Sequence, residues 1–318
     1  MSLLSGLFGI IVGRAVTASV LIGIGLAIGY GIFTAWIEED TRIGIIDIPF
    51  TVISDDSAAF IVEMIDLARE DHSIKGVVIK LNSPGGGVAA SEKLFFEVER
   101  LRREKPVIIS VSDLAASGGY MMSLGANEIF ARPGSTVGSV GALTNVFPDP
   151  PPDESLVGTG PAKLTGGAQR TFIAQLELIK DAFIENVFSQ RGDVLKISRD
   201  ELAEARVYTG MEGLRLGLID RLGTDSDAID RVAELAGISD FELVNVNVEA
   251  LRLRVKQFER VFGSPPDGND QVRLQVNTLA RAFSGGGAQV GVRRGVPPGF
   301  PIEIEIPQFF YLYVAPTQ

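Results

Sequence analysis

The sequence predicts an α/β fold with a largely parallel sheet, and three observations carry this prediction. Strand-like and helix-like segments alternate from residue 42 to residue 236. The strand-like segments are short apolar runs rich in β-branched residues, as in strands buried on both faces. The segments between them carry apolar residues at helical spacing, and parallel strands need such crossover helices. The chain of 318 residues is long enough to bury a sizeable core.

The individual elements follow from these patterns in chain order. Strands are expected at residues 42–48, 76–81, 106–111, 128–131 and, in the tail, 301–314. Helices are expected at residues 56–70, 89–103, 120–124, 169–190, 198–205, 224–236, 247–262 and 271–283. Residues 205–223 combine a short helix with a strand, and the Gly- and Pro-rich segments 83–87, 132–168, 263–269 and 284–289 are expected as loops or linkers.

An uncharged apolar stretch over residues 15–36 is long enough to cross a bilayer as one helix. Arg14 precedes this stretch and the acidic run 38–40 follows it, so the positive-inside rule places residues 1–14 in the cytoplasm. We therefore expect a single-pass anchor in the cell membrane, with the rest of the chain extracytoplasmic. A cleaved signal peptide is the alternative, although the apolar run is long for one.

Composition excludes several classes of function. The net charge of −11 argues against a nucleic-acid partner, because phosphate binding needs a basic surface. The absence of cysteine excludes thiolate nucleophiles and Cys-ligated zinc. His72 is the single histidine, which leaves few options for a His-ligated metal. We expect neither a metal nor an organic cofactor.

The stretch DLAASGGY, residues 113–120, places one hydroxyl, Ser117, between small residues directly after a predicted strand. A serine becomes a nucleophile only when a neighbouring base takes its proton. His72 lies in a polar connection, EDHSIKG, where a solvated histidine is the simpler interpretation. A neutral, buried lysine is the other known base. Among the eight lysines, Lys163 stands apart in VGTGPAKLTGG because no charged residue lies close to it, although a lone loop lysine is often simply exposed.

The segment NSPGGG, residues 82–87, follows a predicted strand and opens a helix. Its backbone amides are placed to bind an anion, and two converging N–H groups would stabilise the oxyanion of acyl transfer. An ordinary strand-to-helix turn and a phosphate-binding loop remain open as alternatives, although the Lys-Ser/Thr of a P-loop is missing.

Five motifs together resemble the signal peptide peptidase SppA family, the protease IV-like serine peptidases: LNSPGGG, DLAASGGYMMS, STVGSVGAL, GPAK and RVYTGMEGLRLGLIDRLG. The resemblance implies a fold of stacked β-β-α units related to the Clp protease and crotonase families. It also implies a Ser–Lys dyad of Ser117 as nucleophile and Lys163 as general base, with Ser139 orienting the lysine. Gly85, Gly86 and Gly118 would then form the oxyanion hole.

The same resemblance implies remnant signal peptides as substrates, a homo-oligomer, and a peptidase domain over residues 42–244. The run FPDPPPDES departs from the apolar residues usual in the family, which puts the side-chain preference in doubt. Residues 245–318 match no part of the family and are expected as an extension of unknown role, whose apolar end could pair with a sheet or lie in the substrate groove. A crotonase-like acyl-thioester enzyme and a non-catalytic membrane scaffold are the competing functions.

Overall fold

The computed structural model describes residues 17–31, 41–144, 159, 168–262 and 309–312. The chain divides into two units, Met1–Thr41 and Arg42–Gln318. In the first unit, residues 17–31 form a helix with exposed side chains. No helix within the described ranges is both long and apolar enough to span a membrane. The expected anchor extends beyond this helix on both sides, so it stays a prediction, and the expected helix at 271–283 lies outside the described residues.

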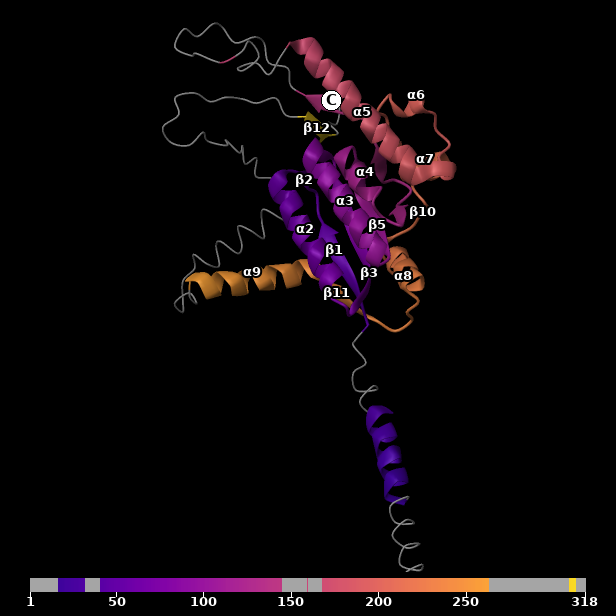
Figure 1. The fold of residues 1–318 in the computed structure, drawn as a ribbon. Coiled ribbons are helices and arrows are strands. Elements are labelled where there is room, and N and C mark those ends of the chain that lie inside the picture. The colour runs from indigo at the N-terminus through magenta and orange to yellow at the C-terminus, as the bar shows by residue number, and fades with distance from the viewer. Residues whose placement is uncertain (1–16, 32–40, 145–158, 160–167, 263–308, 313–318) are drawn as a thin grey trace, which may run out of the picture. The chain divides into compact units, whose positions relative to one another are not determined.

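The second unit is built on a mainly parallel sheet, which confirms the predicted α/β class (Figure 1). Six parallel strands lie in the order β10-β6-β5-β3-β1-β11: β10 (Arg221–Leu222), β6 (Glu128–Ala131), β5 (Val107–Ala116), β3 (Ile74–Ser83), β1 (Arg42–Ile48) and β11 (Glu242–Asn245). β7 (Thr136–Gly138) lies parallel to the carboxyl end of β5, and β9 (Val207–Thr209) pairs with β7 in the antiparallel direction.

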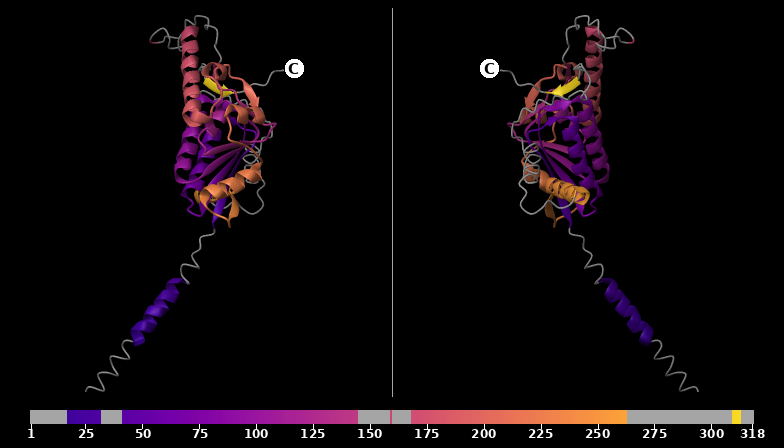
Figure 2. Two further views of the ribbon diagram at one scale, coloured as in Figure 1. Left: turned by 90° about the vertical axis from the view of Figure 1, so that its right-hand side faces the viewer. Right: turned by 90° about the vertical axis from the view of Figure 1, so that its left-hand side faces the viewer.

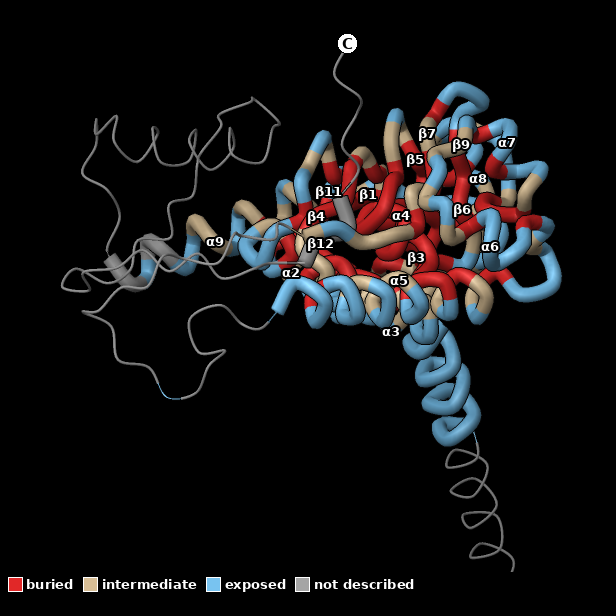
Figure 3. Tube along the Cα trace, turned by 90° about the horizontal axis from the view of Figure 1, so that it is seen from above, coloured by how far each residue is buried: buried red, intermediate tan, exposed pale blue. Residues whose placement is uncertain are grey.

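Helices cover both faces of this sheet because its strands are apolar on both sides. Val77, Ile79 and Leu81 of β3 face the layer that holds α2 (Asp55–Glu70) and α3 (Val88–Glu104). Val78 belongs to the opposite cluster, under α8 (Asp225–Ala236). The alternation follows from the two-residue period of a strand. In Figure 3 the central strands β1, β3, β5 and β6 are largely buried, while the outer sides of the helices are exposed.

A second, smaller sheet has the order β2-β4-β12-β8. Its strands are β2 (Val52–Ile53), β4 (Gly85–Gly87), β12 (Phe309–Leu312) and β8 (Leu143–Thr144). The prediction of a plain loop at residues 83–87 is therefore wrong, as is that of an uninterrupted loop at 132–168, which contains β7 and β8. Glycine strands lack the β-branched signature of a strand. β4 pairs because glycine allows close approach: a Cβ on Gly86 would lie 1.9 Å from the Ile53 oxygen.

The chain order gives two successive β-β-α units, β1-β2-α2 and β3-β4-α3. The remaining elements are α4 (Gly118–Ser123), α5 (Gln169–Arg191), the 3-10 helix η1 (Gly192–Val194), α6 (Arg199–Leu202), α7 (Gly210–Leu216) and α9 (Val246–Phe262). Helix bounds agree with the predicted ones to within three residues, and β5 extends five residues beyond its predicted end. β11 completes the sheet beside β1, and α9 packs on α2 and β1.

Candidate active site

Ser117 lies at the junction of β5 and α4, where the carboxyl end of a central strand turns into a helix. Its φ of 53° and ψ of −119° lie in a region that residues other than glycine rarely adopt. The side chain is 1% exposed. The Ser117 N–H donates to the Gly138 oxygen at 2.7 Å, and its carbonyl accepts from Met121 N–H at 2.8 Å. The junction therefore holds one hydroxyl in a strained, buried backbone turn.

Ser83, at the end of β3, joins the segments around this junction. It is fully buried, and its hydroxyl donates to the Thr51 oxygen at 2.6 Å and accepts from Gly85 N–H at 3.1 Å. A Cβ on Gly119 would lie 2.7 Å from the backbone oxygen of Ser83, so only glycine lets α4 start this close to β3. One serine thus links the segment before β2, the start of β4 and the start of α4. Sequence reasoning did not single it out.

The glycines predicted to hold an oxyanion lie on β4 and at the start of α4. Gly85 has a φ of 97°, and its N–H is already donated to Ser83. Gly86 pairs with Ile53 of β2 and with Tyr311 of β12. Gly118 is the first residue of α4, where N–H groups have no acceptor within the helix. Gly118 thus offers an N–H without an acceptor in its helix, whereas Gly85 donates to Ser83 and Gly86 is paired within the small sheet.

Ser139 stands directly beyond the pairing of β5 with β7, in which Ala116 lies opposite Gly138. Ser117 and Ser139 are therefore the next residues along two neighbouring strands. Ser139 also has a positive φ, 55°, and its N–H donates to the Arg206 oxygen at 2.8 Å. Further along this segment, the Gly141 oxygen lies 3.5 Å from Ser117 Oγ. The structure thus brings Ser117 and Ser139 to the same edge of the sheet.

His72 lies at the opposite edge of the sheet from Ser117. It is exposed and immediately precedes the region where β3 begins, whereas Ser117 follows the end of the parallel strand β5. Each strand has ten residues, which at ~3.3 Å per residue separates the two edges by roughly 30 Å. The arrangement rules out a Ser117–His72 pair.

Lys163 lies outside the described residues, so the Ser117–Lys163 dyad stays a prediction. The other seven lysines are described, and none of them lies at the carboxyl ends of β3, β5 or β7. Lys105 lies at the opposite edge, where it donates to the oxygens of Ala68 and Asp71. Lys80 pairs with Asp225 of α8 at 3.1 Å.

Behind Ser117, α4 is fixed by buried polar contacts that sequence reasoning also missed. The Tyr120 hydroxyl donates to the Leu218 oxygen at 2.8 Å, and complete burial raises the pKa of this phenol. Arg191, at the end of α5, donates to both carboxylate oxygens of Asp220 and to the Gly217 oxygen. Isolated tyrosines and arginines carry no sequence signal for such long-range pairs.

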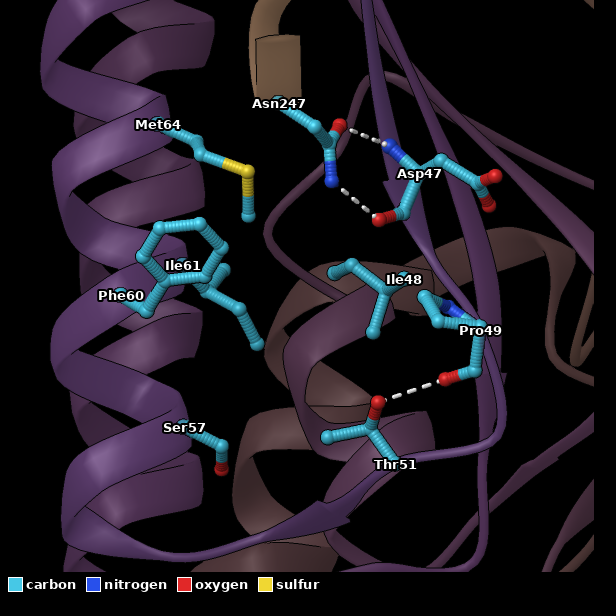
Figure 4. Close-up of a pocket in the computed structure, with 9 residues that line it drawn as sticks. All are labelled: Asp47, Ile48, Pro49, Thr51, Ser57, Phe60, Ile61, Met64 and Asn247. Carbon is cyan, nitrogen blue, oxygen red and sulfur yellow. Dashed lines mark hydrogen bonds between the residues drawn. The ribbon is translucent and has the colours of Figure 1, made fainter. Parts of the chain in front are cut away.

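A small pocket lies apart from the Ser117 junction, between the end of β1, α2 and the start of α9 (Figure 4). Asn247 closes one side of this pocket by bonding both backbone groups of Asp47, at 2.8 and 2.7 Å. The remaining walls are mainly apolar, from residues such as Ile48, Phe60 and Met64. None of the predicted site residues lines it.

The fold and the junction define an α/β protein that carries a strained serine between a parallel strand and a helix. A family model described as peptidase family S49 matches residues 99–148 and 157–239. The matched ranges include Ser117, Ser139 and Lys163, whereas Gly85 and Gly86 precede them. This match supports the resemblance to the signal peptide peptidase SppA family that the sequence motifs predicted.

Three curated relatives illustrate the extent of the similarity. A protein of Methanocaldococcus jannaschii is 32% identical over 205 residues, covering 60% of this chain and 66% of that one. Protease 4 of Haemophilus influenzae is 30% identical over 214 residues, 61% of this chain and 35% of that protein. The chloroplastic serine protease SPPA of Arabidopsis thaliana is 32% identical over 192 residues, 56% of this chain and 28% of that protein. The chain thus spans less than two thirds of each.

Among solved structures, a membrane-bound stomatin-specific protease matches with a TM-score of 0.44 and 18% identity, covering 65% of this chain and 94% of that one. This score is too low to establish a common fold, so the architecture rests on the strands and helices described above.

Proposed function

We propose that the chain is a serine endopeptidase in which Ser117 is the nucleophile and Lys163 the general base. The observation that carries this proposal is the Ser117 junction itself. Backbone strain at a buried hydroxyl is kept only where the surroundings enforce it, and such positions cluster at active sites. A strand-to-helix turn of this kind presents a serine in many hydrolases. Similarity to peptidase family S49 and the two β-β-α units, which the resemblance predicts, support the same function.

In the proposed reaction, neutral Lys163 takes the proton from Ser117 while Oγ attacks the carbonyl carbon of the scissile peptide bond. The Gly86 and Gly118 amides stabilise the oxyanion that forms. Protonated Lys163 then gives its proton to the leaving amine, and an ester with Ser117 remains. Lys163 then takes a proton from a water molecule that attacks this ester, and gives it to Ser117 Oγ as the carboxyl product leaves. Ser139 orients the lysine.

Chemical labelling tests the nucleophile directly. A fluorophosphonate probe is expected to modify Ser117, with fluoride leaving, and peptide mapping locates the adduct. Ser117→Ala should abolish labelling and peptide hydrolysis, whereas Ser123→Ala, also buried and on the same helix, should retain both. Full retention of hydrolysis by Ser117→Ala would exclude this mechanism. Hydrolysis that is absent from the unaltered chain would favour a scaffold or an acyl-thioester enzyme.

The proposed base makes a separate prediction about pH. Only neutral lysine accepts the proton, so kcat/KM should rise from neutral to mildly alkaline pH. Lys163→Arg keeps the charge but cannot act as a base, and should lose hydrolysis as completely as Lys163→Ala. A rate that falls steadily between about pH 6 and pH 9 would contradict the assignment of a lysine base.

We further propose a membrane anchor over residues 15–36, an extracytoplasmic peptidase domain, remnant signal peptides as substrates, and a homo-oligomer. The anchor rests on the sequence pattern. The oligomer is supported by the first half of α5, which exposes Ile173 and Leu178, the latter at 70%. Carbonate extraction of membranes should leave the chain in the pellet, and protease added to intact spheroplasts should degrade it. Light scattering in detergent should give a mass of several chains, and a mass of one chain would exclude the oligomer.

A further inference from the structure

The tail strand β12 lies between β4 and β8 and pairs with both in the antiparallel direction. Its register places Phe310 opposite Gly87 and Leu143, Tyr311 opposite Gly86, and Leu312 opposite Gly85. In the order β2-β4-β12-β8, β12 separates β4 from β8 and pairs with both strands. Neighbouring strands lie about 4.8 Å apart. Between β4 and β8 there is thus a slot one strand wide, and the tail fills it.

This slot adjoins the Ser117 junction on several sides. β4 supplies Gly85 and Gly86, two of the predicted oxyanion glycines. β8 follows Ser139 and Gly141, whose oxygen lies beside Ser117 Oγ. β12 also packs against α3 and against α4, the helix that begins directly after Ser117. Figures 1 and 2 show β12 at the same end of the main sheet as α4 and α5.

We propose that β12 occupies the backbone position of a bound substrate, so that the tail of the chain competes intramolecularly with substrate. This inference rests on the proposed function. A peptidase that binds its substrate as an added strand needs an open strand position beside its oxyanion glycines. Main-chain hydrogen bonds then hold the segment that contains the scissile bond. The tail sequence FFYLYV, residues 309–314, is uncharged and apolar, so the tail competes with extended apolar peptides in particular.

The tether makes such competition effective even if the strand itself binds weakly. Residues 263–308 join α9 to β12, and a chain of this length spans roughly 150 Å when fully extended. A covalent link within one chain gives β12 an effective concentration of order millimolar. A free peptide must therefore reach a comparable concentration, or bind more tightly, to displace the tail.

A proline at residue 310 tests the inference on the full-length chain. Phe310 is paired on both sides, so proline removes a backbone N–H that one of the two neighbouring strands accepts. Phe310→Pro should lower KM for an apolar peptide about five- to tenfold with kcat unchanged. It should also speed fluorophosphonate labelling of Ser117. Phe310→Val keeps the N–H and a strand-forming side chain, so it is the matched control and should shift KM less.

Addition of a peptide in trans complements the substitution. A synthetic peptide with the sequence of residues 306–315, added to Phe310→Pro, should raise KM again without changing kcat. The same peptide with proline at the position of Phe310 should not. Peptides that leave KM unchanged would overturn the competition. A labelling rate that depends on enzyme concentration would also overturn the intramolecular form, since a second copy would then supply the strand.

Hydrogen exchange separates failure of this inference from failure of the proposed function. Exchange of the β4 amides, residues 85–87, should accelerate in Phe310→Pro whether or not the chain is a peptidase. Faster exchange together with unchanged KM and labelling would show that the tail pairs with β4 away from the substrate position. Absence of labelling in every variant would instead overturn the peptidase assignment.

Discussion

At the scale of single residues, the backbone conformation of Ser117 favours glycine for stability, whereas the proposed activity needs the serine hydroxyl. A residue with a side chain at φ 53° and ψ −119° is destabilised by about 1–3 kcal/mol relative to an unstrained backbone, and glycine relieves this strain. The hydroxyl is therefore kept against a conformational preference for glycine, which is expected of a residue that reacts.

A pair of substitutions measures this strain. Ser117→Gly should be more stable than Ser117→Ala by about 1 kcal/mol in urea unfolding, because only alanine retains the strained Cβ. Both variants should be inactive. Ser123, the last residue of α4, should give the opposite order: Ser123→Gly should be less stable than Ser123→Ala by up to about 1 kcal/mol, since glycine is the poorer helix former. Equal stabilities for the two Ser117 variants would show that the junction is unstrained.

Ser83 is proposed as a positioning residue, because it holds the parts of the site without touching substrate. Ser83→Ala leaves the Thr51 oxygen without this donor and the buried Gly85 N–H without its acceptor, so the unfolding free energy should fall by about 1–3 kcal/mol. If the contact also positions β4, kcat should fall while KM changes little. A loss of stability with wild-type kcat would assign Ser83 a purely structural role. Ser123→Ala, another buried serine whose hydroxyl donates to a backbone oxygen, is the control because that oxygen does not belong to β4.

At the scale of elements, helix α5 is fixed to the sheet by an ion pair as well as by apolar contacts. Arg191 is 7% exposed and forms a two-pronged pair with Asp220, whose carboxylate also accepts Ile129 N–H. The pair joins the end of α5 to β6. Because the sequence separation is large, no local pattern signals it.

Removal of Arg191 alone should lower the unfolding free energy more than removal of both Arg191 and Asp220. Arg191→Met should lower the unfolding free energy by about 3–5 kcal/mol, because Asp220 is then left partly buried and unpaired. The double variant Arg191→Met, Asp220→Leu should recover part of that loss. Urea unfolding of the two variants decides the matter, and a double variant that is less stable than the single one would contradict the argument.

At the scale of the whole molecule, the sequence predicts what depends on local periodicity. The strand bounds at 42–48 and 128–131 are confirmed, because short apolar runs that contain β-branched residues favour a buried strand. It did not predict β4, β7, β8 or β11, which are short and gain their order from neighbours far along the chain. For the site, the glycines beside Ser117 indicated this residue in the sequence. The contacts of Ser83 and the position of β12 between β4 and β8 depend on pairing between distant segments.

Stability of the whole molecule should decline in acid, and Asp225 is one reason. Burial disfavours its charged form, but hydrogen bonds from Ser110 and Lys80 outweigh burial and hold its pKa below the ordinary 3.8. A group whose pKa is lower in the folded state binds protons more readily when unfolded. Its stabilisation is therefore present above about pH 4 and is lost as pH falls through the folded pKa.

Asp225→Asn removes this dependence at one site. At neutral pH the variant should be less stable by about 1–2 kcal/mol, the low end for hydrogen bonds to a charged group, because Asp225 is partly exposed to solvent. Between about pH 4 and pH 2 the difference from the unaltered chain should shrink, because protonated Asp225 no longer attracts Lys80. Urea unfolding followed at several pH values measures both quantities. A constant difference across this range would show that Asp225 contributes through packing, and the coupling of α8 to β3 and β5 would then not be electrostatic.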